Sequence, residues 1–232
     1  MSGSPGGGVI QALEKPGGKV EVLASESGRL NGTDSDPSWP APKVSLKSNQ
    51  KARADLPGRI TKTEYRDTEE VFKAKVKLLA KWIKQASNQV IYAGAGMSTA
   101  AGINDVASST RKVESGNRLL MQPTVAHHIV TAMYHKGYIK HVCHQNHDGL
   151  CQKAGLPMSA LNEIHGSWFD KHNIVKMMDD KLNPKNLAML HEWEAKSDIV
   201  IAVGTSLAGM NADQIAELAG QNPNKKLVII NN

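Results

Sequence analysis

The strongest constraint on the fold is an uninterrupted apolar stretch, Ile199-Val200-Ile201-Ala202-Val203, late in the chain. A strand with one face in water alternates apolar and polar residues. A parallel strand that is covered on both faces is instead a continuous run of aliphatic and β-branched residues. The small polar turn Gly204-Thr205-Ser206 ends the run. The stretch therefore predicts a buried strand of a parallel sheet with helices on both faces.

Further strands and helices alternate along the chain from Gln89 onward, and one more predicted helix precedes them. The predicted strands are Gln89–Ala93, Tyr138–His144, Asp198–Val203 and Leu227–Ile230. Segments with apolar residues at helical spacing lie among them, and these predicted helices span residues 68–85, 123–137, 187–195 and 211–219. Regular alternation of strand and helix predicts an α/β fold with a doubly wound parallel sheet.

The first quarter of the chain has a different composition. Gly, Ser, Pro and charged residues are scattered through it with little sustained periodicity, as in Ser4-Pro5-Gly6-Gly7-Gly8. Such a segment buries too little apolar surface to offset the entropy lost on folding. We expect residues 1–57 to form a disordered tail and residues 58–232 to form the folded domain.

Charge, cysteine content and hydropathy narrow the class of protein. The net charge of +6 is spread along the sequence, which indicates an anionic partner only weakly and does not require nucleic acid. The two cysteines, Cys143 and Cys151, cannot make a disulfide framework or a four-thiolate zinc site. No apolar run approaches the roughly 18 to 20 residues that cross a bilayer. We expect a soluble intracellular protein without membrane contact; the sequence does not distinguish nucleus from cytoplasm.

A glycine-rich turn follows the predicted strand at residues 89–93. In Gly94-Ala95-Gly96-Met97-Ser98 the glycines let backbone amides approach an anion, and the helix start that follows adds partial positive charge. This arrangement predicts a phosphate-binding turn, although Thr99 stands where the dinucleotide fingerprint has its third glycine. The alternative is a simple tight connection, because glycine is the default residue of any strained turn.

Polar side chains also follow two other predicted strands. Gln145-Asn146-His147-Asp148-Gly149-Leu150 comes directly after the strand that ends at His144. Ligands of open α/β sheets bind at that end of the strands. An apolar alternation through Leu161 and Ile164 leads to His165, whose imidazole has an ordinary pKa of about 6.5 and is suited to moving a proton. Because Gly166 follows, His165 is also compatible with a simple turn.

Two other polar groups are not assigned to a site. His127 and His128 are adjacent on a predicted helix and point about 100° apart, so they cannot share a metal and are interpreted as packing or surface histidines. Asp179 and Asp180 are consecutive carboxylates on an irregular segment, which is typical of a solvated turn.

Four separated segments resemble the motifs of the sirtuin family of NAD-dependent protein deacylases. In chain order they are Gly94–Asp105, Gln145–Leu150, Ile164–Gly166 and Gly204–Leu207. The resemblance covers about Asp67 to Asn232, and four motifs in the family's order are more specific than any one of them. It implies a Rossmann-type domain with NAD in an extended cleft. It also implies a reaction in which the acyl group of a protein lysine passes to ADP-ribose as nicotinamide leaves.

The resemblance implies a role for each matching residue. His165 would be the general base, and Asn146 would act with it in catalysis by positioning the ribose. The implied cofactor contacts are Gly94, Ala95, Gly96 and Ser98 at the pyrophosphate, Gly204, Thr205 and Ser206 near the ribose and phosphates, Gln145 and Asn146 at the ribose, Asp105 and Asp148 at the nicotinamide, and Asn231 on the adenosine side. The implied partner is an acylated lysine of a protein substrate.

The chain departs from the family pattern after the catalytic histidine. Family members carry a zinc ribbon with two cysteine pairs there, whereas residues 168–186 contain no cysteine, so no zinc is expected. Asp105-Val106-Ala107 stands where the family has Asp-Phe-Arg, which removes an aromatic shield and a guanidinium donor. The chain also stops one residue after Asn231, where family members continue. The pattern predicts a divergent, zinc-less and C-terminally shortened member.

Three functions remain open at this point. The first is an NAD-dependent lysine deacylase. The second keeps NAD but transfers ADP-ribose to water or to a protein side chain, as an NAD glycohydrolase or ADP-ribosyltransferase does; the missing zinc module and aromatic shield favour it. The third is a non-catalytic NAD-binding module. Nicotinamide release with and without an acylated peptide distinguishes the three.

Overall fold

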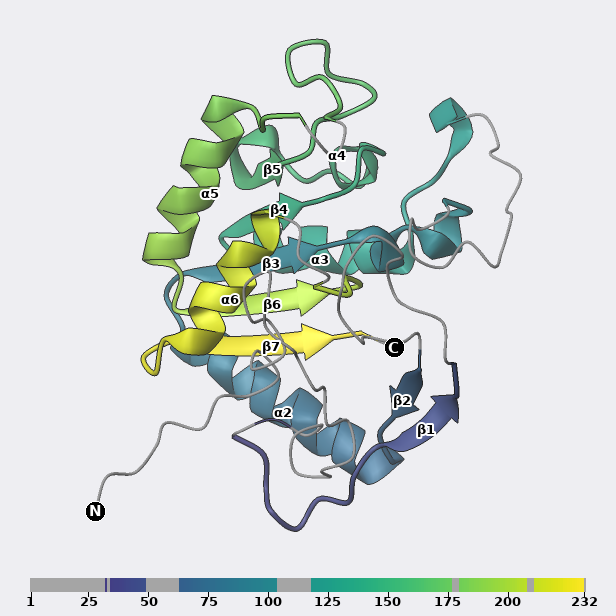
Figure 1. Ribbon diagram of the computed structural model, residues 1–232, viewed down its shortest axis with the longest axis vertical. Coiled ribbons are helices and arrows are strands. Elements are labelled where there is room, and N and C mark those ends of the chain that lie inside the picture. Colours follow the sequence, from purple (N-terminus) through teal and green to yellow (C-terminus); the bar gives the residue numbers. More distant parts are fainter. Residues whose placement is uncertain are drawn as a thin grey trace, which may run out of the picture.

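A five-stranded parallel sheet forms the centre of the molecule (Figure 1). The computed structural model describes Gly32 and residues 34–48, 63–103, 118–176, 180–207 and 211–231. The strand order is β5-β4-β3-β6-β7, and every neighbouring pair is parallel. The strands are β3 (Gln89–Ala93), β4 (His141–His144), β5 (Leu161–Glu163), β6 (Ile199–Val203) and β7 (Lys226–Ile230). The predicted doubly wound sheet is confirmed.

Helices cover both faces of the sheet. They are α2 (Glu69–Gln85), α3 (Val125–His135), α4 (Leu150–Lys153), α5 (Pro184–Lys196) and α6 (Gln214–Gln221). Short 3-10 helices are η2 (Ala95–Met97), η3 (Thr99–Ala101), η4 (Arg118–Leu120), η5 (Met158–Ala160) and η6 (Asn211–Asp213). Residues of α2, α3 and α4 join one apolar cluster, and residues of α5 and α6 join the other.

The side chains of the two central strands divide between these two clusters. Ile91 and Ile201 pack on the α2 and α3 side, whereas Val90 and Val200 pack on the α5 and α6 side. Successive side chains of a strand point to opposite faces, so a strand that is covered on both sides needs apolar residues at every position. This is the physical reason for the continuous apolar run in β6.

The predicted helices are present with small shifts at their ends. Thr68 precedes α2 as its N-cap, and its Oγ1 accepts a hydrogen bond of 3.4 Å from the Val71 amide. The predicted helix 211–219 divides into η6 and α6. The predicted strand 138–144 is shorter, because β4 begins only at His141. Tyr138 still belongs to the turn after α3, where its amide donates to the Met133 carbonyl at 2.9 Å.

A two-stranded antiparallel ribbon lies outside the main sheet. It pairs β1 (Lys43–Leu46) with β2 (Glu64–Arg66), and Thr63 Oγ1 donates to the Ser48 carbonyl at 2.9 Å. β1 lies inside the segment 1–57 that the sequence predicts to be disordered, so that prediction is wrong for these four residues. Their order depends on a partner strand about twenty positions away, which local composition does not reveal. Residues 1–31 lie outside the described part, and the domain boundary stays a prediction.

Among the described residues, no helix is both long enough and apolar enough to cross a membrane.

Parallel strands place all their carboxyl ends at one edge of the sheet (Figure 1). The segments that follow β3, β4, β5, β6 and β7 are therefore neighbours, although they are scattered from residue 94 to residue 231. This edge contains most of the residues that the sequence singled out.

Candidate functional site

Two turns of small residues meet at the carboxyl edge, one after β3 and one after β6. The Gly94 amide donates to the Val203 carbonyl at 3.0 Å, and the Gly96 amide donates to the Gly204 carbonyl at 2.8 Å. A Cβ on Gly96 would lie 2.7 Å from the Cα of Gly204, closer than backbone atoms allow. Gly204 has a φ of +59°, which favours glycine. The glycines are therefore needed for close contact between the two turns.

The backbone hydrogen bonds between the two turns determine which backbone amides are still available to bind a ligand. Gly94 and Gly96 use their amides within the protein, so these are not the free donors that the sequence suggested. In the described part of the chain, the amides of Ala95 and Ser206 have no protein acceptor. Ala95 is half-buried and Ser206 is exposed. Backbone amides beside a glycine turn are suitable donors for an anionic phosphate, so this edge fits a nucleotide cofactor.

A hydrogen-bonded chain connects the first two motifs. The Asn146 Nδ2 donates to the Gly94 carbonyl at 3.2 Å and to Ser98 Oγ at 2.9 Å. Ser98 Oγ in turn donates to Asp148 Oδ2 at 2.6 Å. Asp148 also accepts a bond of 2.9 Å from the Leu150 amide, which holds the start of α4. Ser98 and Asp148 are both buried, so their hydrogen bonds hold the Asn146 side chain in one position.

Asp148 is ionised in this network. Burial acts to raise its pKa, but the neighbouring His144 imidazole and the hydrogen bonds from Ser98 and Leu150 outweigh burial, so the pKa lies below its usual value. A buried carboxylate whose oxygens are both hydrogen-bonded is a fixed negative charge. Such a charge near the site can favour a developing positive charge on a substrate.

A second chain of polar contacts connects β3, β4 and β6. The Gln145 Nε2 donates to Thr205 Oγ1 at 3.1 Å and to Asp213 Oδ1 at 3.5 Å. Asp213 is fully buried and accepts a bond of 2.7 Å from the Tyr92 hydroxyl. Burial and the Asp213 charge raise the pKa of Tyr92, so the tyrosine stays protonated as a donor. Sequence reasoning missed Asp213; the one available signal was Tyr92, a polar tip in an apolar strand.

His165 lies two residues after the end of β5 and has a defined tautomer. Its Nδ1 is 3.2 Å from the Gln145 carbonyl oxygen, which can only accept, so Nδ1 carries the proton and Nε2 keeps a lone pair. His165 is 8% exposed. Burial is the main cause that lowers the pKa of His165 below its ordinary value. A neutral imidazole with a free Nε2 has the form that a general base requires.

His147 lies beside His165 and Trp168 lies beside His147, and sequence reasoning gave neither of them a role. The ring centroids of His147 and His165 are 6.4 Å apart, and those of His147 and Trp168 are 6.1 Å apart. The His147 Nδ1 contacts the Gly166 carbonyl at 3.1 Å. Gly166 has a φ of +90°, and a Cβ there would lie 2.3 Å from the Ile174 carbonyl oxygen. The backbone after His165 thus requires glycine.

The structure brings most of the predicted site residues together, but not all. The turns after β3, β4, β5 and β6 are connected by the contacts described above. Asn231 follows β7 at the same edge and is exposed. Asp105 lies outside the described residues, so its predicted contact stays a prediction. The individual cofactor contacts of the other residues also stay predictions.

A surface hollow of about 530 Å³ lies at the opposite edge of the sheet. Asn88, Lys140 and Trp193 are among the residues that line it, and the first two directly precede β3 and β4. None of the four motifs contributes to this hollow. The residues with a chemical rationale lie at the carboxyl edge, which remains the candidate site.

Sequence comparison finds relatives that are named as deacetylases. The chain is 31% identical over 155 residues to the Homo sapiens protein "NAD-dependent protein deacetylase sirtuin-7", a match that covers 63% of this chain and 37% of that protein. It is 35% identical over 123 residues to the Drosophila melanogaster protein "NAD-dependent protein deacetylase Sirt6", covering 49% and 39%. The chain thus spans less than half the length of these curated relatives. No family model matches the chain.

Comparison with solved structures identifies the same fold. "Structure of Sir2Tm bound to a propionylated peptide" superposes with a TM-score of 0.58 and 21% identity, covering 68% of this chain and 86% of that one. "Sir2-p53 peptide-NAD+" superposes with a TM-score of 0.56 and 21% identity, covering 67% and 86%. The chain thus has the fold of the Sir2 structures, and in sequence it is similar to sirtuin-7 and Sirt6 of the sirtuin family.

Proposed function

We propose that the protein is an NAD-dependent protein lysine deacylase. In this reaction nicotinamide is released from NAD, and the acyl group of a modified lysine passes to ADP-ribose. The observation that carries the proposal is the state of His165. Its Nδ1 proton is held by the Gln145 carbonyl and its Nε2 is free, at the same edge as the paired glycine turns. The names of the relatives point to the same activity.

The residues at this edge fit NAD. The Ala95 and Ser206 amides would bind the pyrophosphate, and Gln145 and Asn146 would hold the ribose. Asp148 would line the nicotinamide pocket together with Asp105, and Asn231 would approach the adenosine. Gly94, Gly96, Ser98, Gly204 and Thr205 would shape the turns around the phosphates. When bound, NAD supplies an ADP-ribosyl group whose positively charged nicotinamide is a good leaving group.

The protein contributes positioning, charge and a base. Asn146 is held at two points, by the Gly94 carbonyl and by Ser98 Oγ, so it would orient the ribose with little loss of entropy. The ionised Asp148 would favour the positive charge that develops as nicotinamide leaves. His165 would then accept the proton of a ribose hydroxyl at Nε2. The partner would be a protein segment that presents an acylated lysine.

We also propose that NAD is the cofactor of this reaction and that no four-thiolate zinc module contributes within this chain. Cys143 and Cys151 are both buried and belong to different apolar clusters. Two thiols cannot supply the four sulfur ligands of a zinc ribbon.

The test is nicotinamide release from NAD by the purified full chain. Parallel reactions contain an acetyl-lysine peptide, the same peptide without the acetyl group, or no peptide. We expect release only with the acetylated peptide, together with acylated ADP-ribose as the second product. The His165→Asn variant should lose at least about 100-fold in rate, because no base remains. The matched control is His172→Asn, since His172 is exposed and has no role in the site.

Other results would select another function. Nicotinamide release that does not depend on peptide would indicate an NAD glycohydrolase or ADP-ribosyltransferase. Calorimetric binding of NAD without turnover would indicate a non-catalytic module. If NAD does not bind at all, each of these nucleotide-based functions is wrong. The unfolding curve of His165→Asn should match that of the parent, so that loss of rate is not mistaken for loss of fold.

A further inference from the structure

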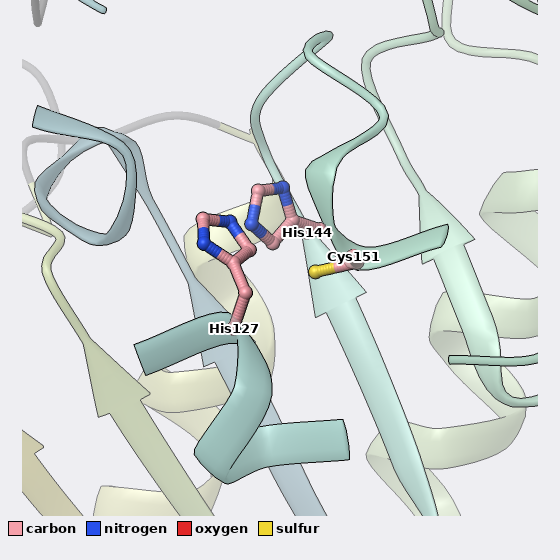
Figure 2. Close-up of side chains that lie close together, drawn as sticks. All are labelled: His127, His144 and Cys151. Atoms are coloured by element: carbon pink, nitrogen blue, oxygen red, sulfur yellow. The ribbon is translucent and has the colours of Figure 1, made fainter. Parts of the chain in front are cut away.

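Three side chains that bind transition metals in many proteins lie together behind the proposed NAD site. His127 is on α3, His144 ends β4, and Cys151 is on α4 (Figure 2). One ligand atom from each lies within 4.8 Å of the other two. Their exposed fractions are 0%, 2% and 3%. We call this group the His127–His144–Cys151 cluster.

Both imidazoles of the cluster have an unsatisfied nitrogen. Within the described residues, Nε2 of His127 and Nε2 of His144 are buried and have no hydrogen-bond partner. Figure 2 shows the two rings with nitrogens facing each other and the Cys151 sulfur nearby. Burying an unpaired polar atom is costly, so two such atoms directed at one point require a physical reason. A shared ligand between them would supply one.

The other ring nitrogen of His127, Nδ1, forms hydrogen bonds with a residue outside the cluster. This Nδ1 accepts a bond of 3.1 Å from the Thr124 amide, so in the metal-free protein Nε2 carries the proton, and Nδ1 also lies 2.8 Å from Thr124 Oγ1. The Thr124 hydroxyl donates its own proton to the Met97 carbonyl at 2.8 Å, which leaves Oγ1 able to accept a proton from Nδ1. A metal at Nε2 would move the ring proton to Nδ1, and in that tautomer Nε2 has a free lone pair. An outer hydrogen bond of this kind is what orients metal-binding histidines.

His144 has the same tautomer as His127. Its Nδ1 accepts a bond of 3.2 Å from the Asn146 amide, so in the metal-free protein Nε2 carries the proton and points toward His127. A metal at Nε2 would move this proton to Nδ1 and displace the Asn146 bond. That bond is long and weak compared with a metal–imidazole bond.

We propose that the His127–His144–Cys151 cluster binds one zinc ion through the two Nε2 atoms and the Cys151 sulfur. Two imidazoles and a thiol suit zinc and do not suit magnesium or calcium, which prefer oxygen. Binding forms two Zn–N bonds and one Zn–S bond. It breaks the S–H bond of Cys151 and releases that one proton to solvent. A fourth ligand would come from water.

The local charge is compatible with this ion. Zinc with one thiolate carries a net charge of +1, and the ionised Asp148 interacts electrostatically with all three members of the cluster. The ion would fasten α3 and α4 to the end of β4. It would thereby brace residues 145–148, which include Gln145, Asn146 and Asp148. The zinc would thus be structural and would sit behind the reaction site.

This site differs from the zinc ribbon whose absence the sequence predicts. It uses one thiol and not four, and its ligands come from three elements of the main domain. It also agrees with the expectation that His127 and His128 do not share a metal, because His128 is exposed on another face of α3.

The experiment measures metal binding by tag-free full-length protein after chelation and dialysis. Zinc alone is titrated calorimetrically, and Co²⁺ is used as the spectroscopic probe. We expect one equivalent of zinc, a sulfur-to-cobalt charge-transfer band, and a higher unfolding temperature with zinc. Cys151→Ala should lose the band, and Cys151→Ala and His127→Gln should each bind zinc about 100-fold more weakly or worse.

Matched controls use the neighbouring residues of the same types. Cys143→Ala removes the other thiol, and His128→Gln removes the adjacent exposed histidine; both should keep the cobalt band and one equivalent of zinc. Circular dichroism checks that each variant is folded. The proposal is overturned if the parent binds no zinc at micromolar concentration, or if Cys151→Ala and His127→Gln bind as tightly as the parent. These readouts do not depend on deacylase activity.

Discussion

The Nδ1 atom of His165 lies 3.2 Å from the main-chain carbonyl oxygen of Gln145, although the two residues are twenty positions apart. The contact arises because β4 and β5 are parallel neighbours, so the residues that follow them are also adjacent. One contact therefore sets the tautomer of the proposed base and connects it to the segment that contains Asn146. The predictions below start from this arrangement.

The first prediction concerns the pH dependence of turnover. Burial, with a smaller effect of His147, lowers the pKa of His165, while the Gln145 carbonyl partly opposes the shift. A general base acts in its neutral form, so activity should persist as pH falls through 6.5, the ordinary histidine pKa, and decline only below it. The measurement is kcat/KM for nicotinamide release from about pH 5 to about pH 8. An acid limb centred at or above 6.5 would contradict it.

The second prediction concerns Asn146. Asn146→Ala removes the bonds of 3.2 Å to Gly94 and 2.9 Å to Ser98, and with them the group that would orient the ribose. We expect kcat to fall by about 10- to 100-fold, because misplacement of a reacting group has an effect of this size. The control is Asn224→Ala on the surface turn before β7, which should leave kcat unchanged. Equal losses in the two variants would place the site elsewhere.

The third prediction concerns the contact between the glycine turns. In Gly96→Ala the new Cβ would lie 2.7 Å from the Cα of Gly204, and neither backbone can move freely. The turns must separate, which should lower the free energy of unfolding by about 1 to 3 kcal/mol and weaken NAD binding. Denaturant unfolding and NAD titration measure the two effects.

Gly137→Ala is the comparison for Gly96→Ala. A Cβ there has no atom within 4 Å, and its φ of +77° adds only backbone strain of about 1 kcal/mol. Gly137 lines the hollow at the opposite edge, so NAD affinity should not change. If Gly96→Ala binds NAD as well as Gly137→Ala does, the turns do not form the cofactor site.

The fourth prediction concerns stability at acid pH. Burial lowers the pKa of His141 from 6.5 to about 4, and its ring stacks on Trp193 at 4.7 Å. The pKa of His141 is lower in the folded protein than in the unfolded chain. The contribution of His141 to the free energy of unfolding is therefore fully present above pH 6.5 and is lost as pH falls toward 4. The loss attributable to this one histidine should reach about 2 kcal/mol near pH 5.

Urea unfolding of the parent and of His141→Phe at neutral and acid pH tests this assignment. Phenylalanine retains an aromatic ring against Trp193 but does not titrate, so the variant should lose less stability on acidification than the parent. Other buried histidines titrate in both proteins and cancel in the difference. Identical pH dependence of the two proteins would show that His141 does not contribute.

The sequence by itself determined the class of fold and the place of the candidate site. The apolar run of β6 requires cover on both faces, and the alternation of strands and helices makes the sheet parallel. Polar and glycine-rich segments after β3, β4, β5 and β6 must then share one edge. These properties depend on residues that are close in sequence, which is why periodicity and turn composition predict them.

The tertiary structure decided which distant side chains meet. Asp213 reaches Tyr92 across 121 positions, and His127, His144 and Cys151 converge from three elements. The strand order β5-β4-β3-β6-β7 and the packing of α3 and α4 produce these contacts. The pairing of β1 with β2 has the same origin. No local pattern encodes such contacts, because their energy depends on burial and on partners that only the folded chain supplies.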